Sequence, residues 1–224
     1  MGQSIDSAEA EQALLQRDAT ALLDQIDLLS RLARRGAVAI VGAMPMGLLV
    51  ARDIDVHVRP PTVSRAALMG VVADLVETPG VQVIRLHNMW DYGPPDFAWR
   101  PPDQPRHRGF LVEMDYLRAP GSAEAWHVDL WMLPTDVPDD AAVMATRMCA
   151  AMARDSGLRP AVLLLKRALA ALTLPRRIPS VLVYRAALED GARDMAGLLA
   201  SMRQRQPDLA AILGAAWTRS AGVG

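Results

Sequence analysis

The sequence is poor in cysteine, lysine and aromatic residues, and it has no long apolar run. Its one cysteine, Cys149, excludes a disulfide framework or a cysteine-rich zinc site and predicts a reducing, cytoplasmic setting. No apolar stretch reaches the ~18–20 residues that a membrane span needs, and the N-terminus has no signal-peptide pattern. The formal net charge of −1 indicates no overall attraction to nucleic acid or membranes. We therefore expect a cytoplasmic protein that does not enter the membrane.

The rest of the composition is that of an ordinary globular protein. Hydrophobic residues make up 51% of the 224 residues and charged residues 22%, which excludes wholesale disorder. This length suits one large domain or two small ones.

The apolar pattern predicts a mixed sheet followed by a helical region. Helical spacing predicts a first helix over residues 7–34 and another over 63–76. Short apolar or alternating runs predict strands at 37–41, 53–58, 81–87, 110–117 and 125–133. Beyond Pro138 the pattern predicts helices at 139–155, 159–173, 180–190 and 193–217. We expect an α/β (α+β) fold with a core over 1–138 and a helical C-terminal subdomain over 139–224.

Three aspartates stand out as candidates for a metal site. Asp53 and Asp55 are two apart on a predicted strand, so their side chains share one face about 6.6 Å apart along the chain. Asp129 lies on a later strand with the same alternation. Converging carboxylates repel one another unless a cation neutralises them, and oxygen ligands of this kind suit Mg²⁺ or Mn²⁺.

The order of these elements resembles the DNA polymerase β-like nucleotidyltransferase superfamily. That signature is a glycine-containing loop, a spacer of about ten residues, an Asp-hydrophobic-Asp strand and a later acid. In this chain the loop is Gly42-Ala43-Met44-Pro45-Met46-Gly47, the strand motif is Asp53-Ile54-Asp55, and Asp129 is the later acid. The segment Ile178–Gly191 also looks like a C-terminal helix of small bacterial nucleotidyltransferase-domain proteins.

The resemblance implies transfer of a nucleoside monophosphate from a triphosphate, ATP by expectation, to an acceptor hydroxyl with release of pyrophosphate. It implies that Asp53, Asp55 and Asp129 bind Mg²⁺ or Mn²⁺ and perform the catalysis. The loop at Gly42 and Ala43 would hold the triphosphate through its backbone N–H groups. Ala43 stands where the family usually has serine, so a catalytically weakened nucleotide-binding module is an alternative.

Lys166 and Tyr184 are the candidate nucleotide contacts of the helical region. Lys166 is the single lysine among 24 basic residues, and the resemblance favours a contact with the β- or γ-phosphate. The alternative is a lysine that extends along the edge of an apolar helix face. Tyr184 would stack on the base or ribose, or else pack in the core with its hydroxyl at the rim.

Other polar residues near the motif have simpler interpretations. We interpret Arg52 as a solvated arginine at a strand edge. His57 and His127 share the faces of the aspartates, but three carboxylates already suffice as ligands. Glu113 and Asp115 compete with Asp129 for the third acidic position, and the clean alternation around Asp129 favours that residue.

Aromatic residues indicate where an acceptor would bind. Eight of the ten lie between Trp90 and Trp131, in predicted strands or the loop that joins them. They are Trp90, Tyr92, Phe97, Trp99, Phe110, Tyr116, Trp126 and Trp131. Such side chains form sheet cores or bind ring-bearing ligands.

With a net charge near zero, this cluster favours a small-molecule hydroxyl acceptor. An RNA- or protein-directed nucleotidyltransferase is the alternative, and the basic residues Arg100, Arg106, His107 and Arg108 support RNA. A glycosyltransferase that binds Mn²⁺ through Asp-x-Asp is a further alternative. It is disfavoured because only about fifty residues precede the motif.

Overall fold

The computed structural model describes residues 4–89, 109–117 and 124–221, and the chain divides into two compact units. The sheet unit comprises residues 15–145, and the helical unit comprises residues 1–14 and 146–224. Helices α1 (Ile5–Gln25) and α4 (Asp140–Arg154) supply residues to both units. The assignment of the core to 1–138 and of a subdomain to 139–224 stays a prediction.

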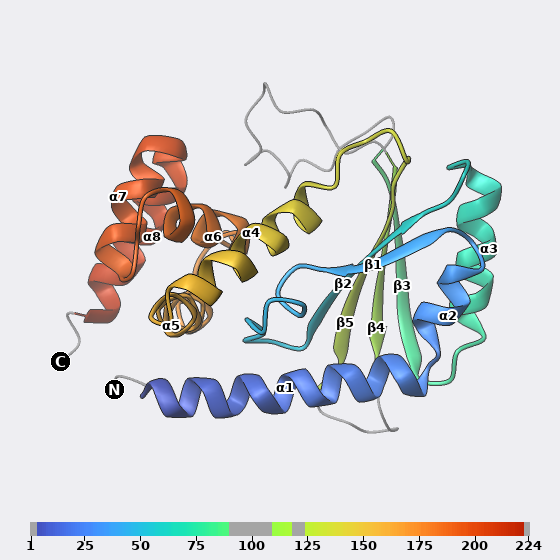
Figure 1. Ribbon diagram of the computed structural model, residues 1–224, viewed down its shortest axis with the longest axis horizontal. Coiled ribbons are helices and arrows are strands. Elements are labelled where there is room, and N and C mark those ends of the chain that lie inside the picture. Colours follow the sequence, from blue (N-terminus) through green and yellow to red (C-terminus); the bar gives the residue numbers. More distant parts are fainter. Residues whose placement is uncertain (1–3, 90–108, 118–123, 222–224) are drawn as a thin grey trace. The chain divides into compact units, whose positions relative to one another are not determined.

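The sheet unit contains a five-stranded mixed sheet (Figure 1). The strand order is β1-β2-β5-β4-β3. Only the central β2–β5 pair is parallel, and the other neighbours are antiparallel. The strands are β1 (Ala37–Val41), β2 (Asp53–Arg59), β3 (Val81–Asn88), β4 (Phe110–Tyr116) and β5 (Trp126–Met132). The expected mixed sheet with helices is confirmed.

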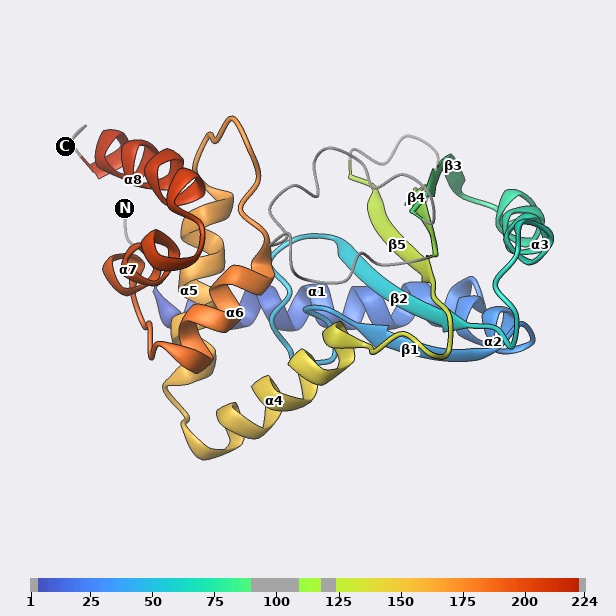
Figure 2. The ribbon, with the colours of Figure 1, turned by 90° about the horizontal axis from the view of Figure 1, so that it is seen from above.

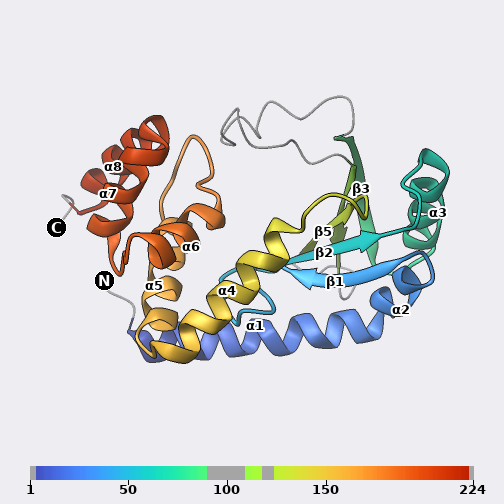
Figure 3. The same ribbon diagram turned by 45° about the horizontal axis from the view of Figure 1, so that its top comes forward.

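Helices cover one face of this sheet. The sheet-unit part of α1 lies with α2 (Leu28–Ala33) and α3 (Arg65–Val76) against this face (Figure 3). Apolar side chains of these helices share one buried core with alternate residues of the strands. Ile54 and Val56 of β2 and Val128 of β5 are at most 1% exposed in this core. Because strand side chains alternate, the intervening residues of β2 and β5 point to the opposite face.

The first helix ends earlier than the sequence pattern predicts. A single helix over 7–34 is wrong, because the chain leaves the helix after α1 and resumes it in α2. Asp27 lies between them in the left-handed region, with φ 48°. Aspartate tolerates that conformation better than most residues, and apolar spacing does not reveal it.

The helical unit contains α5 (Leu158–Ala170), α6 (Ser180–Glu189), α7 (Met195–Arg205) and α8 (Pro207–Ala221) (Figure 2). Each of these helices packs against the next one along the chain. The predicted helix over 193–217 is wrong, because it divides at Gln206. Pro207 begins α8, where its missing N–H and fixed φ are tolerated, whereas a proline inside a helix breaks it. In the part of the chain that the structure describes, no helix has the length and apolar character of a membrane span.

Candidate metal centre

The face of the sheet opposite α2 and α3 carries titratable residues at alternate strand positions. The parallel register sets Asp53 beside His127 and Asp55 beside Asp129. The two central strands thus form a two-by-two array of three carboxylates and one imidazole.

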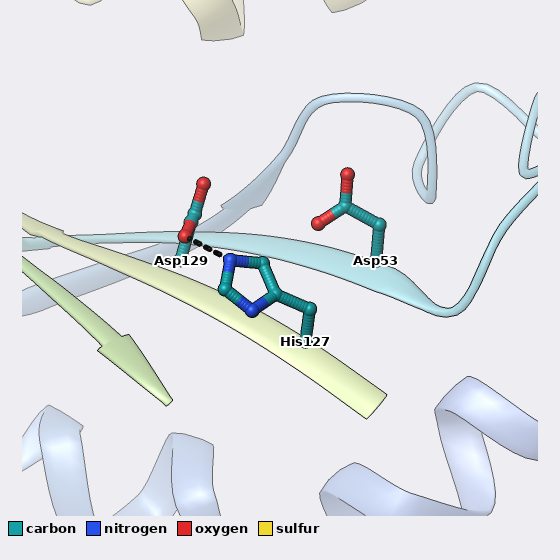
Figure 4. Close-up of side chains that lie close together, drawn as sticks. All are labelled: Asp53, His127 and Asp129. Carbon is teal, nitrogen blue, oxygen red and sulfur yellow. Dashed lines mark ion pairs between the residues drawn. The ribbon is translucent and has the colours of Figure 1, made fainter. Parts of the chain in front are cut away.

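Asp53, His127 and Asp129 form a group that can hold a metal ion (Figure 4). One potential ligand atom from each lies within 4.8 Å of the others, and all three residues are half-buried. Asp53 projects from β2, and the other two project from β5 on the same side. The structure thus brings together two of the three predicted aspartates, together with a histidine that the sequence interpretation set aside.

Asp55 lies on the same face, against Gly42. Gly42 has φ +67°, and a Cβ atom at this position would collide with Asp55 Oδ2. Only glycine offers both the left-handed backbone and the space that this carboxylate fills. The tight turn after β1 and the aspartate pair of β2 therefore depend on each other.

His127 bridges two carboxylates. Its Nε2 lies 3.0 Å from Asp129 Oδ1, and its Nδ1 lies 2.8 Å from Asp115 Oδ1. The Asp129 carboxylate raises the pKa of His127 most, burial opposes the rise, and Asp115 adds to it, so the pKa reaches about 9. Strand alternation alone places His127 beside Asp129, so the sequence contained the signal for its position.

The two competing acids lie one strand further away. Glu113 and Asp115 belong to β4, which pairs with β5 and not with β2. Glu113 Oε2 is 3.0 Å from Nε2 of His87, and Asp115 contacts His127. Asp129 is the acid in register with the Asp53–Asp55 strand.

Arg52 and His57 have partners within the sheet unit. Arg52 donates to Glu124 at 2.8 Å and lies over the ring of Trp126. His57 is buried, and its Nδ1 is 3.0 Å from Asp139 Oδ2. Protein groups of the sheet unit therefore hold both side chains, and Arg52 is ion-paired rather than simply solvated.

Asp139 joins β2 to the start of α4. Its Oδ1 accepts a hydrogen bond from the Ala142 N–H, and Arg59 Nε lies 3.5 Å from Oδ2. Burial alone would raise the pKa of Asp139, but the hydrogen bonds from His57 and Ala142 and nearby positive charge lower it to about 2.

We expect Asp139 to contribute acid-dependent stability. A carboxyl whose pKa falls on folding stabilises the protein above its unfolded pKa of 3.8, and this contribution disappears as the pH falls to about 2. Asp139→Ala should lower the free energy of unfolding at pH 7 by about 1–3 kcal/mol. Asp139→Asn keeps a capping side chain but loses the charge, so its unfolding free energy should fall less with acid. Urea unfolding between pH 7 and pH 2 tests this, and an unchanged acid dependence in Asp139→Asn would contradict it.

Lys166 and Tyr184 contact each other in the helical unit. Lys166 is 7% exposed, its Nζ donates to the Tyr184 hydroxyl at 2.9 Å, and it lies 5.3 Å from the ring centroid. Burying an ammonium group is costly unless polar partners stabilise it. A lysine at the solvent edge of the helix is therefore the wrong description, whereas the nucleotide role stays a prediction.

The aromatic residues are divided between the two faces of the sheet. Phe110, Tyr116 and Trp126 belong to the helix-covered core. Trp131 is 9% exposed and packs with Leu111 on the other face. Trp90, Tyr92, Phe97 and Trp99 lie outside the described residues, as do Arg100, Arg106, His107 and Arg108. Among the described aromatics of this cluster, Trp131 alone lies on the carboxylate face.

No protein-family model and no curated protein sequence matches this chain. Solved structures do match. The Cid1 poly(U) polymerase with MgGTP bound has a TM-score of 0.55 at 15% identity, covering 78% of this chain and 49% of that one. Cid1 with the UTP analogue UMPNPP has a TM-score of 0.54 at 14% identity, with 78% and 48% covered. The GLD-2/RNP-8 complex has a TM-score of 0.51 at 11% identity, with 89% and 71% covered.

This chain spans about half the length of the Cid1 chains. At such low identities the likeness shows the fold. The chain shares its fold with these Cid1 and GLD-2 structures.

Proposed function

We propose that this protein transfers a nucleoside monophosphate from a nucleoside triphosphate to a hydroxyl group of RNA and releases pyrophosphate. The main observation is the shared face of β2 and β5, where Asp53 and Asp129 approach each other within the nucleotidyltransferase fold. Asp55 lies on that face beside the Gly42 turn. Carboxylates on neighbouring strands of this kind can bind the divalent ions that phosphoryl chemistry requires.

The residues fit a divalent cation. Asp129 Oδ1 is buried, and Nε2 of His127 lies 3.0 Å from it. A bound cation stabilises the negative charge of such a buried carboxylate oxygen. In this proposal Asp53, Asp55 and Asp129 would hold the divalent ions, which would supply charge stabilisation for the attacking and leaving oxygens.

The chain's own groups would orient the reactants. Asp129 would accept the proton of the acceptor hydroxyl as its oxygen attacks the α-phosphorus and pyrophosphate leaves. In this proposal the backbone N–H groups of Gly42 and Ala43 bind the triphosphate. Lys166 and Tyr184 of the helical unit stay candidate contacts for the outer phosphates and the nucleoside. Ala43 supplies no hydroxyl, so the loop binds through its backbone.

RNA is a better-supported acceptor than a small molecule. Cid1, whose fold this chain shares, is a poly(U) polymerase. The expected aromatic pocket has weaker support, because Phe110, Tyr116 and Trp126 belong to the opposite, helix-covered core. The two Cid1 structures compared above contain GTP and a UTP analogue, so they give no preference for ATP, and the proposal leaves the base open.

Transfer of labelled nucleotide tests the proposal. Each of the four α-³²P-labelled triphosphates is incubated with Mg²⁺ or Mn²⁺ and an RNA oligonucleotide, and with a panel of sugars, aminoglycosides and nucleosides. We expect labelled RNA together with pyrophosphate, and no labelling of RNA whose 3′ end has been oxidised. Label in the small molecules alone would contradict the RNA acceptor. Release of nucleoside diphosphate, or no transfer at all, would contradict nucleotidyl transfer.

Lys166→Met should weaken triphosphate binding. The variant keeps the apolar stem but removes a charge-assisted bond of about 1.5–3 kcal/mol, so the Kd should rise more than tenfold. Isothermal titration with a nonhydrolysable analogue measures this. Arg203→Met, which removes an exposed cation of α7 in the same unit, is the control and should leave the Kd unchanged. An unchanged Kd in folded Lys166→Met would leave Lys166 with a structural role only.

A further inference from the structure

The carboxylate array contains one nitrogen ligand. The register partner of Asp53 on β5 is His127, and its imidazole joins Asp53 and Asp129 in the three-residue group. A site made only of carboxylates would suit Mg²⁺, whereas imidazole nitrogen favours first-row transition ions. The histidine therefore bears on which ion the site selects.

A carboxylate outside the group orients the imidazole. Asp115 Oδ1 lies 2.8 Å from Nδ1 of His127, so this carboxylate accepts a hydrogen bond from the Nδ1–H group. Nε2 is then the nitrogen on the side of Asp129. Histidines that ligate metals commonly donate their other ring N–H to a carboxylate, which fixes the tautomer and makes the ligand more basic.

The distance between the ligand atoms fits a shared cation. Two neighbouring ligands of an octahedral ion, with bonds of about 2.1 Å, lie about 3 Å apart. Nε2 of His127 and Oδ1 of Asp129 are 3.0 Å apart. In the structure these two atoms form an ion pair. Once Nε2 is deprotonated, both atoms are close enough together to bind the same ion.

We propose that His127 Nε2 is a ligand of the cation held by Asp53 and Asp129, and that this site prefers a first-row transition ion, tested as Mn²⁺, to Mg²⁺. Histidine binds a metal as the neutral imidazole, so coordination releases the Nε2 proton to solvent. This proposal rests on the metal site of the proposed function and is independent of the acceptor.

Electron spin-echo envelope modulation of Mn²⁺ bound to the full chain tests the nitrogen ligand directly. We expect ¹⁴N coupling in the wild type that changes to ¹⁵N coupling when histidine alone is labelled with ¹⁵N. His127→Asn should abolish the coupling. The matched control is His87→Asn, which removes another imidazole bonded to a carboxylate, Glu113, outside the metal group, and should retain it.

Affinity measurements give a second readout. Competition titrations should show that Mn²⁺ binds at least about tenfold more tightly than Mg²⁺. His127→Asn should lower the Mn²⁺ affinity at least about tenfold. Asp115→Asn leaves the imidazole in place and should lower the Mn²⁺ affinity about tenfold. If His127→Asn does not fold, Asp115→Asn and the isotope exchange decide the question.

The outcomes separate the two proposals. Bound Mn²⁺ without histidine nitrogen coupling, or coupling that persists in His127→Asn, would overturn the role of His127 and leave the carboxylate site intact. Equal affinities for Mn²⁺ and Mg²⁺ would overturn the preference. Failure of the wild type to bind either ion would overturn both the histidine ligand and the metal site on which the proposed function depends.

Discussion

Asp53→Asn is expected to reduce nucleotide transfer by at least about a thousandfold at saturating Mg²⁺ or Mn²⁺. The substitution removes a carboxylate that approaches Asp129 across the central strand pair. Loss of metal binding should remove several kcal/mol of transition-state stabilisation, and about 1.4 kcal/mol corresponds to a tenfold change in rate. Initial rates of labelled RNA formation measure the effect.

The same variant should fold as well as the wild type or better. Without metal, Asp53 adds negative charge beside Asp55 and Asp129, and its removal relieves repulsion. Thermal unfolding in EDTA should therefore show an equal or higher Tm. The control is Asp24→Asn, which removes an exposed carboxylate of α1 and should change neither rate nor metal affinity. Near-normal transfer by both Asp53→Asn and Asp129→Asn would contradict the assigned roles.

Gly42→Ala should inactivate the protein through Asp55. Gly42 has φ +67°, and the added methyl group would collide with Asp55 Oδ2. The backbone strain costs about 1–2 kcal/mol. A displacement of about 1 Å in a reacting group can lower the rate about a hundredfold, so we expect at least that loss of transfer.

Gly191→Ala is the control that separates the effect of backbone strain from the effect of the collision with Asp55. Gly191 has φ +68°, but a Cβ atom there meets nothing within 4 Å. Both variants should lose a similar amount of stability from the backbone, and Gly191→Ala should keep its transfer rate. Urea unfolding and initial rates measure the two effects. Equal rates for Gly42→Ala and the wild type would show that the Asp55 carboxylate need not occupy its position beside Gly42.

Local patterns predicted most strands and helices within a few residues. Alternation defined β2 and β5 because one face of each strand packs against helices and the other is polar. The two wrong helices continued through Asp27 and Gln206. Those breaks depend on single backbone conformations, which have little effect on the periodicity of apolar residues.

The candidate site was predictable only in part. Alternation places Asp53 beside Asp55 and His127 beside Asp129 on their own strands. The pairing of β2 with β5 is a property of the tertiary fold, so the approach of Asp53 to Asp129 rested on family resemblance. The sequence offers no reason to count His127 as a ligand, because three carboxylates suffice, and only the register with Asp53 and the contact with Asp115 show its position in the group.

Anomalous diffraction from a crystal containing Mn²⁺ and a nonhydrolysable nucleoside triphosphate would locate the metal relative to the aspartates of β2 and β5. We expect an anomalous peak bonded to carboxylate oxygens of Asp53 and Asp129, with the phosphates of the nucleotide as further ligands. A triphosphate bound with its Mn²⁺ away from these two residues would show that the metal site lies elsewhere.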